Sequence, residues 1–331
     1  MLDVDDPELV WPGHEGSITL QRASRDHLMG YVRDEVLRDY QGRPIFEIHP
    51  MSGAVSYRGQ WAVSFCHRMG RGHIALELKK LYEGNPPAVI EHWHRYAVSG
   101  KVAQEDRDRN GNANIAERAK ALVQAFLRLT WAVAQLGDAL GLSFSQRDVG
   151  AFDTAAVEYR GWWTFPELGR LSDVVSLNIP VGEFLERAKD IAVMLELLQE
   201  APMRNVVLTT GLTKKQLGET GTIKLLGTLS QLATTCKKSG HHWPADVDQV
   251  VAGWDKDLRL GAMARLYSLN QLRQKDAHRT GDGFAESLAK DLKAFGIDPA
   301  AHAAGWSDAV DAMFDGLIGD LNEIADLLAV S

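Results

Sequence analysis

Arg273 and His278 have the side-chain types that act on phosphodiesters, and they stand five positions apart late in the chain. A guanidinium can hold a phosphate through two parallel hydrogen bonds, and an imidazole can move a proton near neutral pH. The segment from Tyr267 to His278 has helical spacing, and the run Thr280-Gly281-Asp282-Gly283 follows it. On an unbroken helix the two side chains would diverge by about 140°. We therefore expect the helix to fray at His278, which would let the two groups approach.

The local charge favours an anionic ligand, although a solvated helix face would explain the same run of charges. Residues 256–279 carry six basic side chains and two acids, a local charge of +4. Within this segment Asn270, Lys275 and Arg279 are further candidates for binding a substrate. A purely structural alternative remains open, in which Arg273 pairs with a carboxylate and His278 caps its helix.

The residues Leu272, Arg273, Ala277 and His278 resemble the R-x4-6-H motif of HEPN-domain ribonucleases, in its frequent LRxxxAH form. The resemblance covers residues 181–331 and implies a small helical bundle. It implies a metal-independent endoribonuclease that needs no cofactor for cleavage. In such a site Arg273 holds the scissile phosphate, and His278 activates the 2'-hydroxyl or protonates the leaving 5'-oxygen. The products would carry 2',3'-cyclic phosphates.

The same resemblance implies how the protein works with partners. HEPN sites are built at dimer interfaces, so a homodimer or higher even oligomer acting on RNA is expected. Family members commonly serve as toxins or antiviral (phage-defence) effectors, which implies a separate antitoxin or regulatory chain. Gln274 stands where the family often has Asn, Asp or His. Some HEPN domains are not catalytic, so the alternative is a binding or oligomerisation module in which Arg273 and His278 are structural.

A second pattern, from Asp106 to Glu117, matches the calcium loop D-x-[DN]-x-[DN]-G-x5-E. Its oxygen ligands would come from the side chains or, for Asn112, the backbone carbonyl of Asp106, Asp108, Asn110, Asn112 and Glu117. The alternative is a polar turn between two helices, in which Asn114 and Glu117 form a capping box.

The helices and strands that must position these residues are expected to form two regions, with the boundary at Pro180. Residues 1–180 are expected to form a mixed α+β regulatory or sensing region, and residues 181–331 a HEPN-like helical bundle, so that the fold is mostly α. The first region should contain a helix near 25–40, a small antiparallel sheet and long helices at 88–104 and 114–140. The strands of that sheet are expected at 44–49, 54–57, 61–67 and 73–78. The helices of the bundle are expected at 181–201, 221–238, 245–278, 283–295 and 306–329. In the third of these, the apolar stripe is Leu258, Met263, Leu266, Leu269 and Leu272.

Composition limits the class of protein. With 331 residues, 45% hydrophobic and 24% charged, the chain has the makeup of a globular protein of about two domains. The net charge of −8 argues against indiscriminate nucleic-acid binding. Six acids and no Lys or Arg lie in residues 306–331, so the rest of the chain is nearly neutral. Two distant cysteines, no apolar run long enough to cross a bilayer and an acidic N-terminus favour a cytoplasmic protein.

Overall fold

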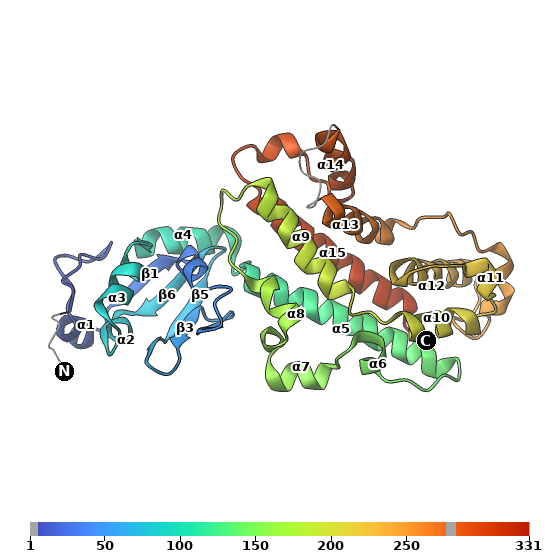
Figure 1. Cartoon of the computed structure of the whole chain (residues 1–331), viewed down its shortest axis with the longest axis horizontal. Coiled ribbons are helices and arrows are strands. Elements are labelled where there is room, and N and C mark those ends of the chain that lie inside the picture. Colours follow the sequence, from blue (N-terminus) through green and yellow to red (C-terminus); the bar gives the residue numbers. More distant parts are fainter. Residues whose placement is uncertain (1–5, 276–282, 331) are drawn as a thin grey trace. The chain divides into compact units, whose positions relative to one another are not determined.

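The computed structural model describes residues 6–275 and 283–330 (Figure 1). The chain is mostly helical with small antiparallel sheets near its N-terminus, as predicted. It separates into two compact units, and the first is Met1–Ala119 with Ser172–Ser176. The second unit is Lys120–Leu171 with Leu177–Ser331.

The division between the units falls inside a long helix, α5 (Ile115–Ala139), and not at Pro180. The later part of α5 bonds to residues of the second unit. Gln146 donates a hydrogen bond to the carbonyl of Leu127, and Arg128 donates to Asn322. These contacts between distant residues explain why a boundary drawn from local composition differs from the observed one.

The first unit contains two antiparallel sheets and several short helices. One sheet has the strand order β5-β6-β1-β7 and the other β2-β3-β4. The strands are β1 (Met29–Arg33), β2 (Phe46–His49), β3 (Ala54–Tyr57), β4 (Trp61–Val63), β5 (Cys66–Met69), β6 (His73–Glu77) and β7 (Ala97–Val98). The helices are α1 (Leu20–Asp26), the 3-10 helix η1 (Asp34–Asp39), α2 (Leu78–Tyr82), α3 (Pro87–His94), α4 (Gly100–Asn110) and the start of α5.

Strand β1 is central to this unit because it pairs with both β6 and β7. Val32 lies opposite Ile74 in the register with β6, and both side chains are fully buried. At Gly30 a Cβ atom would lie 2.6 Å from the side chain of Leu78 and 3.0 Å from the ring of Trp11. Glycine is therefore required there by close packing of the core.

Several buried polar groups in the first unit are paired, although Arg68 Nη2 and Asn85 Oδ1 have no hydrogen-bond partner among the described residues. Arg68 Nη1 lies 2.7 Å from Asp34 Oδ2, and Arg68 Nε donates to the carbonyl of Pro50. Burial nevertheless raises the pKa of Asp34, against the lowering effect of Arg68. The indole N–H of Trp93 donates to the Tyr40 hydroxyl at 3.2 Å. These bonds offset the cost of taking polar groups out of water.

Two helices predicted in the first unit are wrong. In place of a helix near 25–40 there are α1, β1 and η1, because residues 29–33 complete the sheet between β6 and β7. In place of one helix at 88–104 there are α3 and α4, separated by β7. Ala97 and Val98 pair with Val32 and Tyr31, so tertiary pairing with the sheet outweighs local helix propensity.

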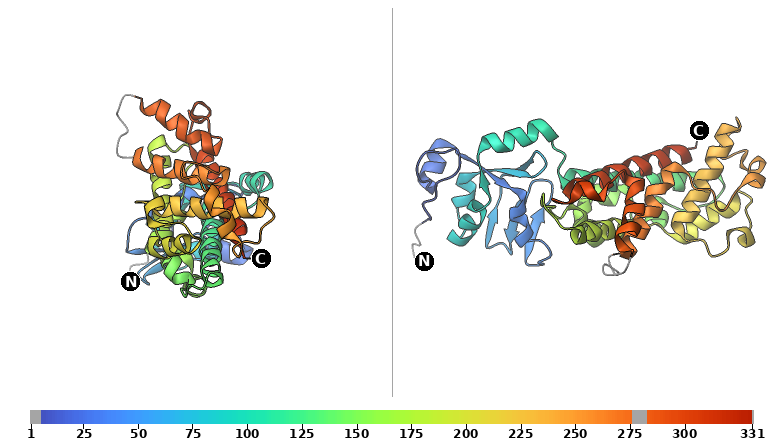
Figure 2. Two further views of the ribbon diagram at one scale, coloured as in Figure 1. Left: turned by 90° about the vertical axis from the view of Figure 1, so that its right-hand side faces the viewer. Right: turned by 90° about the horizontal axis from the view of Figure 1, so that it is seen from above.

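The second unit is helical, and Figures 1 and 2 show its helices from three directions. After α5 come α6 (Gln146–Gly150), α7 (Thr154–Arg160), η2 (Trp162–Thr164), α8 (Pro166–Gly169), η3 (Arg170–Ser172), α9 (Val181–Leu195), α10 (Glu200–Thr209), α11 (Lys214–Leu217) and α12 (Thr222–Lys238). These are followed by η4 (Val247–Gln249), η5 (Val251–Gly253), η6 (Gly261–Met263), α13 (Ala264–Lys275), α14 (Phe284–Leu292), η8 (Lys293–Phe295), η9 (Pro299–His302) and α15 (Ser307–Leu328). Over residues 6–275 and 283–330, no helix combines the length and apolar character needed to cross a membrane.

Helices α9, α13 and α15 pack against one another, and α12 packs against α10 and α15. The helices predicted at 114–140, 221–238, 283–295 and 306–329 are confirmed as α5, α12, α14 and α15. The helix predicted at 181–201 is instead α9 and α10. Pro202 explains the break, because in a continuous helix its ring would clash with the carbonyl of residue 198.

The single helix predicted at 245–278 is wrong over its first part, since only α13 is α-helical within the described residues. Residues 246–263 form short 3-10 turns and extended backbone instead. Gly253 and Gly261 lower the helix propensity of this stretch by about 1 kcal/mol each. Leu258, predicted on the apolar stripe, is 48% exposed, whereas Leu266, Leu269 and Leu272 are buried.

A buried ion pair joins α13 to α15. Arg265 Nη1 lies 2.5 Å from Asp320 Oδ1, and the Asp320 side chain is only 4% exposed. The other carboxylate oxygen of Asp320 and the Nε of Arg265 have no hydrogen-bond partner among the described residues. Burial raises the pKa of Asp320 to about 6, because the opposing effect of Arg265 is smaller.

We expect Asp320 to make the protein less stable as pH rises from 4 to 7. Its pKa in the folded state lies above the ordinary value of about 4, so between these values the folded state binds the extra proton. The stabilisation that this proton gives to the folded state is fully present below pH 4 and is lost as pH rises through 6. Urea unfolding measures the change in the free energy of unfolding between pH 5 and pH 7. This change should differ between wild type and Asp320→Asn by on the order of 1 kcal/mol. An identical pH dependence in the two proteins would contradict the assignment.

Candidate functional site

Arg273 lies at the edge of the buried face of α13. Leu266, Leu269 and Leu272 are buried at helical spacing, and Asn270 and Arg273 follow Leu266 and Leu269 by four residues, so they lie on the same side of the helix at the edge of its buried face. Because α13 packs against α9, α14 and α15, its rotation is determined by these contacts. The Arg273 side chain keeps 38% of its surface exposed.

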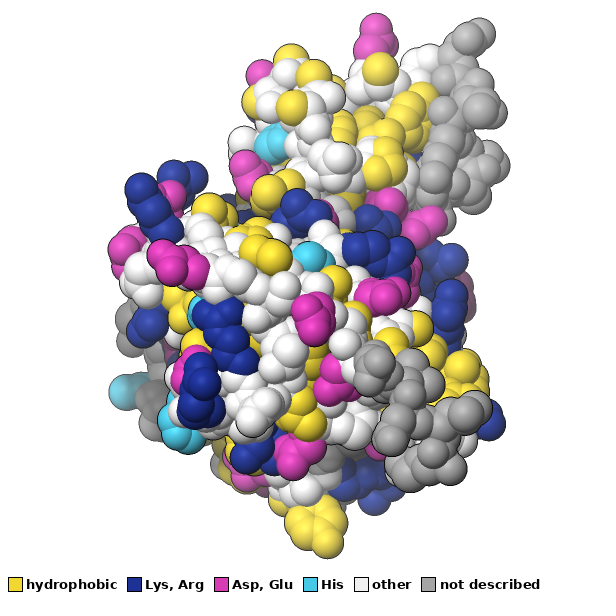
Figure 3. All heavy atoms as spheres, turned by 90° about the vertical axis from the view of Figure 1, so that its left-hand side faces the viewer, with side chains coloured by type: hydrophobic (Ala, Val, Ile, Leu, Met, Phe, Trp, Pro, Cys, Tyr) yellow, Lys and Arg dark blue, Asp and Glu magenta, His cyan; other side chains and the backbone are white. Residues whose placement is uncertain are grey.

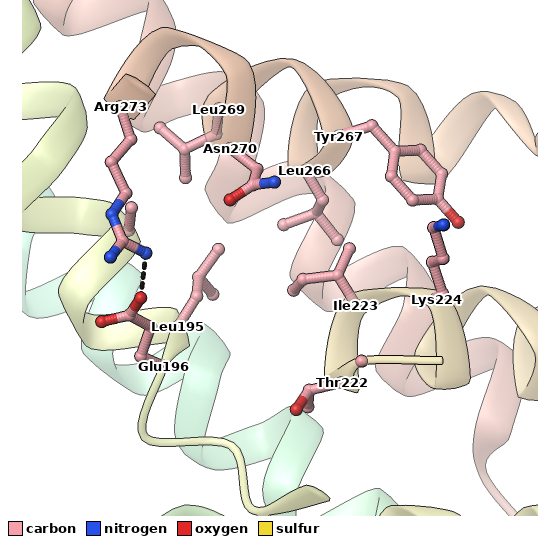
Figure 4. Close-up of a pocket in the computed structure, with 12 residues that line it drawn as sticks. Leu195, Glu196, Thr222, Ile223, Lys224, Leu266, Tyr267, Leu269, Asn270 and Arg273 are labelled. Carbon is pink, nitrogen blue, oxygen red and sulfur yellow. Dashed lines mark hydrogen bonds and ion pairs between the residues drawn. The ribbon is translucent and has the colours of Figure 1, made fainter. Parts of the chain in front are cut away.

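Arg273 lies on the wall of a pocket of about 360 Å³ between α9, the start of α12 and α13 (Figure 4). We call this cavity the α13 pocket. Its lining combines apolar side chains with a few polar groups, an arrangement typical of small-molecule sites. The lining residues are Ala192, Leu195, Glu196, Gly221, Thr222, Ile223, Lys224, Leu266, Tyr267, Leu269, Asn270 and Arg273.

An ion pair between Arg273 and Glu196 joins two walls of the α13 pocket (Figure 4). Arg273 Nη1 donates to Glu196 Oε1, and the Glu196 side chain is 50% exposed. The pairing of Arg273 with a carboxylate, one part of the structural alternative, is therefore observed, whereas the other part, capping by His278, falls outside the described residues. Exposed pairs of this kind contribute at most about 1 kcal/mol to stability, so an anion in the pocket can compete for the guanidinium.

Three other polar groups of the α13 pocket have no hydrogen-bond or ion-pair partner in the described part of the chain. They are the Asn270 amide, the Lys224 ammonium and the Tyr267 hydroxyl. Burial raises the pKa of Tyr267, although the guanidinium of Arg259, 5.0 Å from the ring centre, acts in the opposite direction. In Figure 4 the side chains of Asn270 and Arg273 extend from α13 on the side that faces α9 and α12.

Of the other predicted substrate-binding residues, Lys275 is described and is engaged outside the α13 pocket. Lys275 Nζ lies 3.0 Å from Asp291 Oδ2 and also donates to Ser287, so its ammonium is engaged between α13 and α14. His278 and Arg279 lie outside the described residues. Sequence reasoning missed Glu196, Lys224 and Tyr267, and a contact across 77 positions between Glu196 and Arg273 leaves no local pattern that would reveal it.

The residues predicted to form a calcium loop lie mostly on helix α4. Because Asp106 and Asp108 are two positions apart on a helix, they point about 200° apart. Asp108 accepts a hydrogen bond from Gln104, and Asn110 donates to Asp106. The carbonyl of Asn112 accepts the backbone N–H of Asn114 at 2.8 Å. The oxygens of the motif are therefore not brought together.

Asp106 instead holds a turn between β5 and β6. Its Oδ2 accepts the backbone N–H groups of Arg71 and Gly72, and it lies 2.7 Å from His73 Nδ1. Burial tends to raise the pKa of Asp106, but the hydrogen bonds from Asn110, His73 and Gly72 outweigh it and lower the pKa. At the other end of the motif, Asn114 Oδ1 accepts the backbone N–H of Glu117, as the capping alternative expects.

Comparison with known proteins adds no assignment: no family profile, curated protein or solved structure matches the chain. The function must therefore be argued from the geometry and from the residues themselves.

Asp106 and Asp108 offer a matched test of the calcium loop. We expect Asp106→Ala to lower the free energy of unfolding by about 1–3 kcal/mol, because it leaves the turn donors without an acceptor. Asp108→Ala should change it by less than about 0.5 kcal/mol. A functional calcium loop gives a different result: calcium would raise the melting temperature of wild type, and either substitution would abolish the rise.

Proposed function

We propose that the chain is a metal-independent endoribonuclease of the HEPN type, with Arg273 binding the scissile phosphate beside the α13 pocket. The observation that carries the proposal is the position of Arg273, half-exposed on the wall of a cavity that also holds the unpaired groups of Asn270 and Lys224. A guanidinium whose partner among the described residues is an exposed carboxylate can exchange that partner for a phosphate oxygen. The motif spacing to His278 supplies the group for proton transfer.

The chemistry needs two proton movements. The 2'-oxygen attacks phosphorus while its proton passes to a base, and the bond from phosphorus to the 5'-oxygen breaks as that oxygen receives a proton. An imidazole performs either transfer near neutral pH, and the guanidinium stabilises the extra negative charge on the phosphorus centre. The product ends would be a 2',3'-cyclic phosphate and a 5'-hydroxyl.

Charge is a constraint on this proposal, because the whole chain carries −8. On the face drawn in Figure 3, Lys and Arg side chains are interspersed with Asp and Glu, with no broad patch of one sign. Attraction of RNA must therefore come from a local group of cations. A homodimer joining two copies of the 256–279 segment would double its +4 charge at one cleft. A cytoplasmic toxin or phage-defence role, held in check by a separate antitoxin or regulatory chain, fits such an enzyme.

The second candidate is a non-catalytic bundle that binds a partner or oligomerises. The ion pairs of Arg273 with Glu196 and of Lys275 with Asp291 favour it, since both hold α13 to neighbouring helices. The two candidates differ in whether RNA is cleaved.

Substituting the proposed catalytic residues should abolish cleavage without unfolding the protein. We expect Arg273→Ala and His278→Ala each to lower the rate of RNA cleavage at least 100-fold, because each removes a group that acts on the phosphate or its proton. Arg128→Ala is the matched control, since Arg128 also forms an exposed ion pair, with Asp326. Cleavage should persist in EDTA. Wild-type rates in both variants, or activity that requires added magnesium, would reject the proposal in favour of the binding module or another mechanism.

The active form is expected to be a homodimer or a higher even oligomer. Specific activity should then fall on dilution below the dimer dissociation constant and on addition of salt. Mixing Arg273→Ala chains with wild type should lower the activity per wild-type chain, because mixed dimers hold an incomplete site. Light scattering would identify the species. A monomer whose specific activity is independent of concentration would contradict this arrangement.

A further inference from the structure

The α13 pocket holds more polar groups than a phosphate needs. Arg273 is sufficient to bind the anion, yet Glu196 and Asn270 face the same cavity (Figure 4). A carboxylate can only accept hydrogen bonds, and it repels phosphate. The presence of Glu196 beside Arg273 therefore indicates a ligand that carries hydrogen-bond donors as well as negative charge.

The ion pair between Glu196 and Arg273 explains why the ligand needs both a negative charge and hydrogen-bond donors. In the free protein the Glu196 carboxylate accepts from Arg273. When a phosphate takes the guanidinium, the carboxylate loses this donor in a pocket walled by Leu195, Ile223 and Leu266. Because Glu196 is half-exposed, water can replace the lost donor, and a ligand whose own N–H groups reach the carboxylate binds more tightly than one that presents acceptors to it.

Among the RNA bases, guanine alone presents two adjacent N–H donors, N1–H and the N2 amino group, on its Watson–Crick edge. These match the two oxygens of a carboxylate. Adenine and cytosine present an acceptor next to their amino group, and uracil places one N–H between two carbonyl oxygens. Against a carboxylate each of these edges brings acceptors together, which is unfavourable.

The third group on the guanine edge, the O6 acceptor, also finds a donor. The Asn270 amide and the Lys224 ammonium are both unpaired within the described residues and both line the α13 pocket. Leu195, Ile223, Leu266 and Leu269 supply apolar surface for the faces of the ring. Asn270 lies one helical turn before Arg273, a rise of about 4.5 Å, so a base and its neighbouring phosphate can be held together.

We propose that the α13 pocket binds the guanine base of an RNA nucleotide next to the scissile phosphate, with Glu196 accepting from N1–H and N2 and with Asn270 or Lys224 donating to O6. This assigns a substrate preference to the proposed ribonuclease and rests on that function for its biological meaning. Binding of the base itself depends only on the pocket.

Mononucleotide binding tests the pocket without cleavage. Calorimetry with GMP, IMP, AMP, CMP, UMP and inorganic phosphate should show GMP binding at least tenfold more tightly than each of the others. IMP is the sharpest comparison because it lacks only the 2-amino group. Glu196→Gln should abolish the difference between GMP and IMP without weakening the binding of inorganic phosphate, because it removes a negative charge that repels the anion and competes for Arg273. Equal affinity for the six ligands, or no binding, would overturn the proposal.

Glu200→Gln is the matched control for Glu196→Gln. Glu200 also forms an ion pair with an arginine, Arg204, and its side chain is 52% exposed, but it lies outside the α13 pocket. This variant should keep the wild-type preference for GMP. Loss of the preference in both variants would show that it reflects general charge and would count against the pocket.

Mapping of cleavage sites separates this proposal from the ribonuclease itself. Both are supported if wild type cuts RNA next to guanosine and Glu196→Gln cuts without base preference. Selective GMP binding by a protein that cuts no RNA would reject the nuclease and retain the guanine pocket. Cutting that depends on Arg273 but shows no preference for guanosine, unchanged in Glu196→Gln, would reject the guanine pocket and retain the nuclease.

Discussion

The second unit depends on the burial of one face of α13. Leu266, Leu269 and Leu272 are packed in the core, and Arg273 lies at the edge of the same face, so a rotation of the helix would expose the leucines and move Arg273 away from the α13 pocket. Such a rotation is costly, since each buried leucine contributes about 2 kcal/mol. The core thus determines where the guanidinium points. The chemistry of the α13 pocket is a consequence of helix packing.

Ion pairs across helix contacts then add specificity to this packing. Arg265 with Asp320, Lys275 with Asp291 and Arg273 with Glu196 join α13 to three neighbouring helices. They differ in exposure, and this separates their roles. The Asp320 carboxylate is almost inaccessible, so no ligand can replace its partner, whereas the Arg273 pair faces a cavity that a ligand can enter. Of the three, only the last is available for exchange.

Sequence periodicity predicted the elements that are stabilised by their own amphipathic faces. Helices α5, α12, α14 and α15 are found close to their predicted ranges because each has a continuous apolar stripe. Sequence periodicity failed where contacts with residues far away in the sequence determine the local secondary structure. Ala97 and Val98 become a strand because they pair with β1, and the motif at Asp106 lies on a helix because its carboxylate binds the turn before His73. The position of Arg273 was predictable, but its partner Glu196 was not, since the two meet only after α9 and α13 pack.

The composition of the α13 pocket follows from the same constraint. A lone guanidinium on a surface would attract any anion, and in a chain of charge −8 it would also attract the carboxylates of its own fold. Placing Glu196 opposite Arg273 satisfies the guanidinium in the free protein, so the bundle does not require a ligand to be stable. It also favours a ligand that offers hydrogen-bond donors to the displaced carboxylate over one that presents acceptors. In the guanine pocket that we propose, a single ion pair would in this way both stabilise the empty site and discriminate among nucleotides.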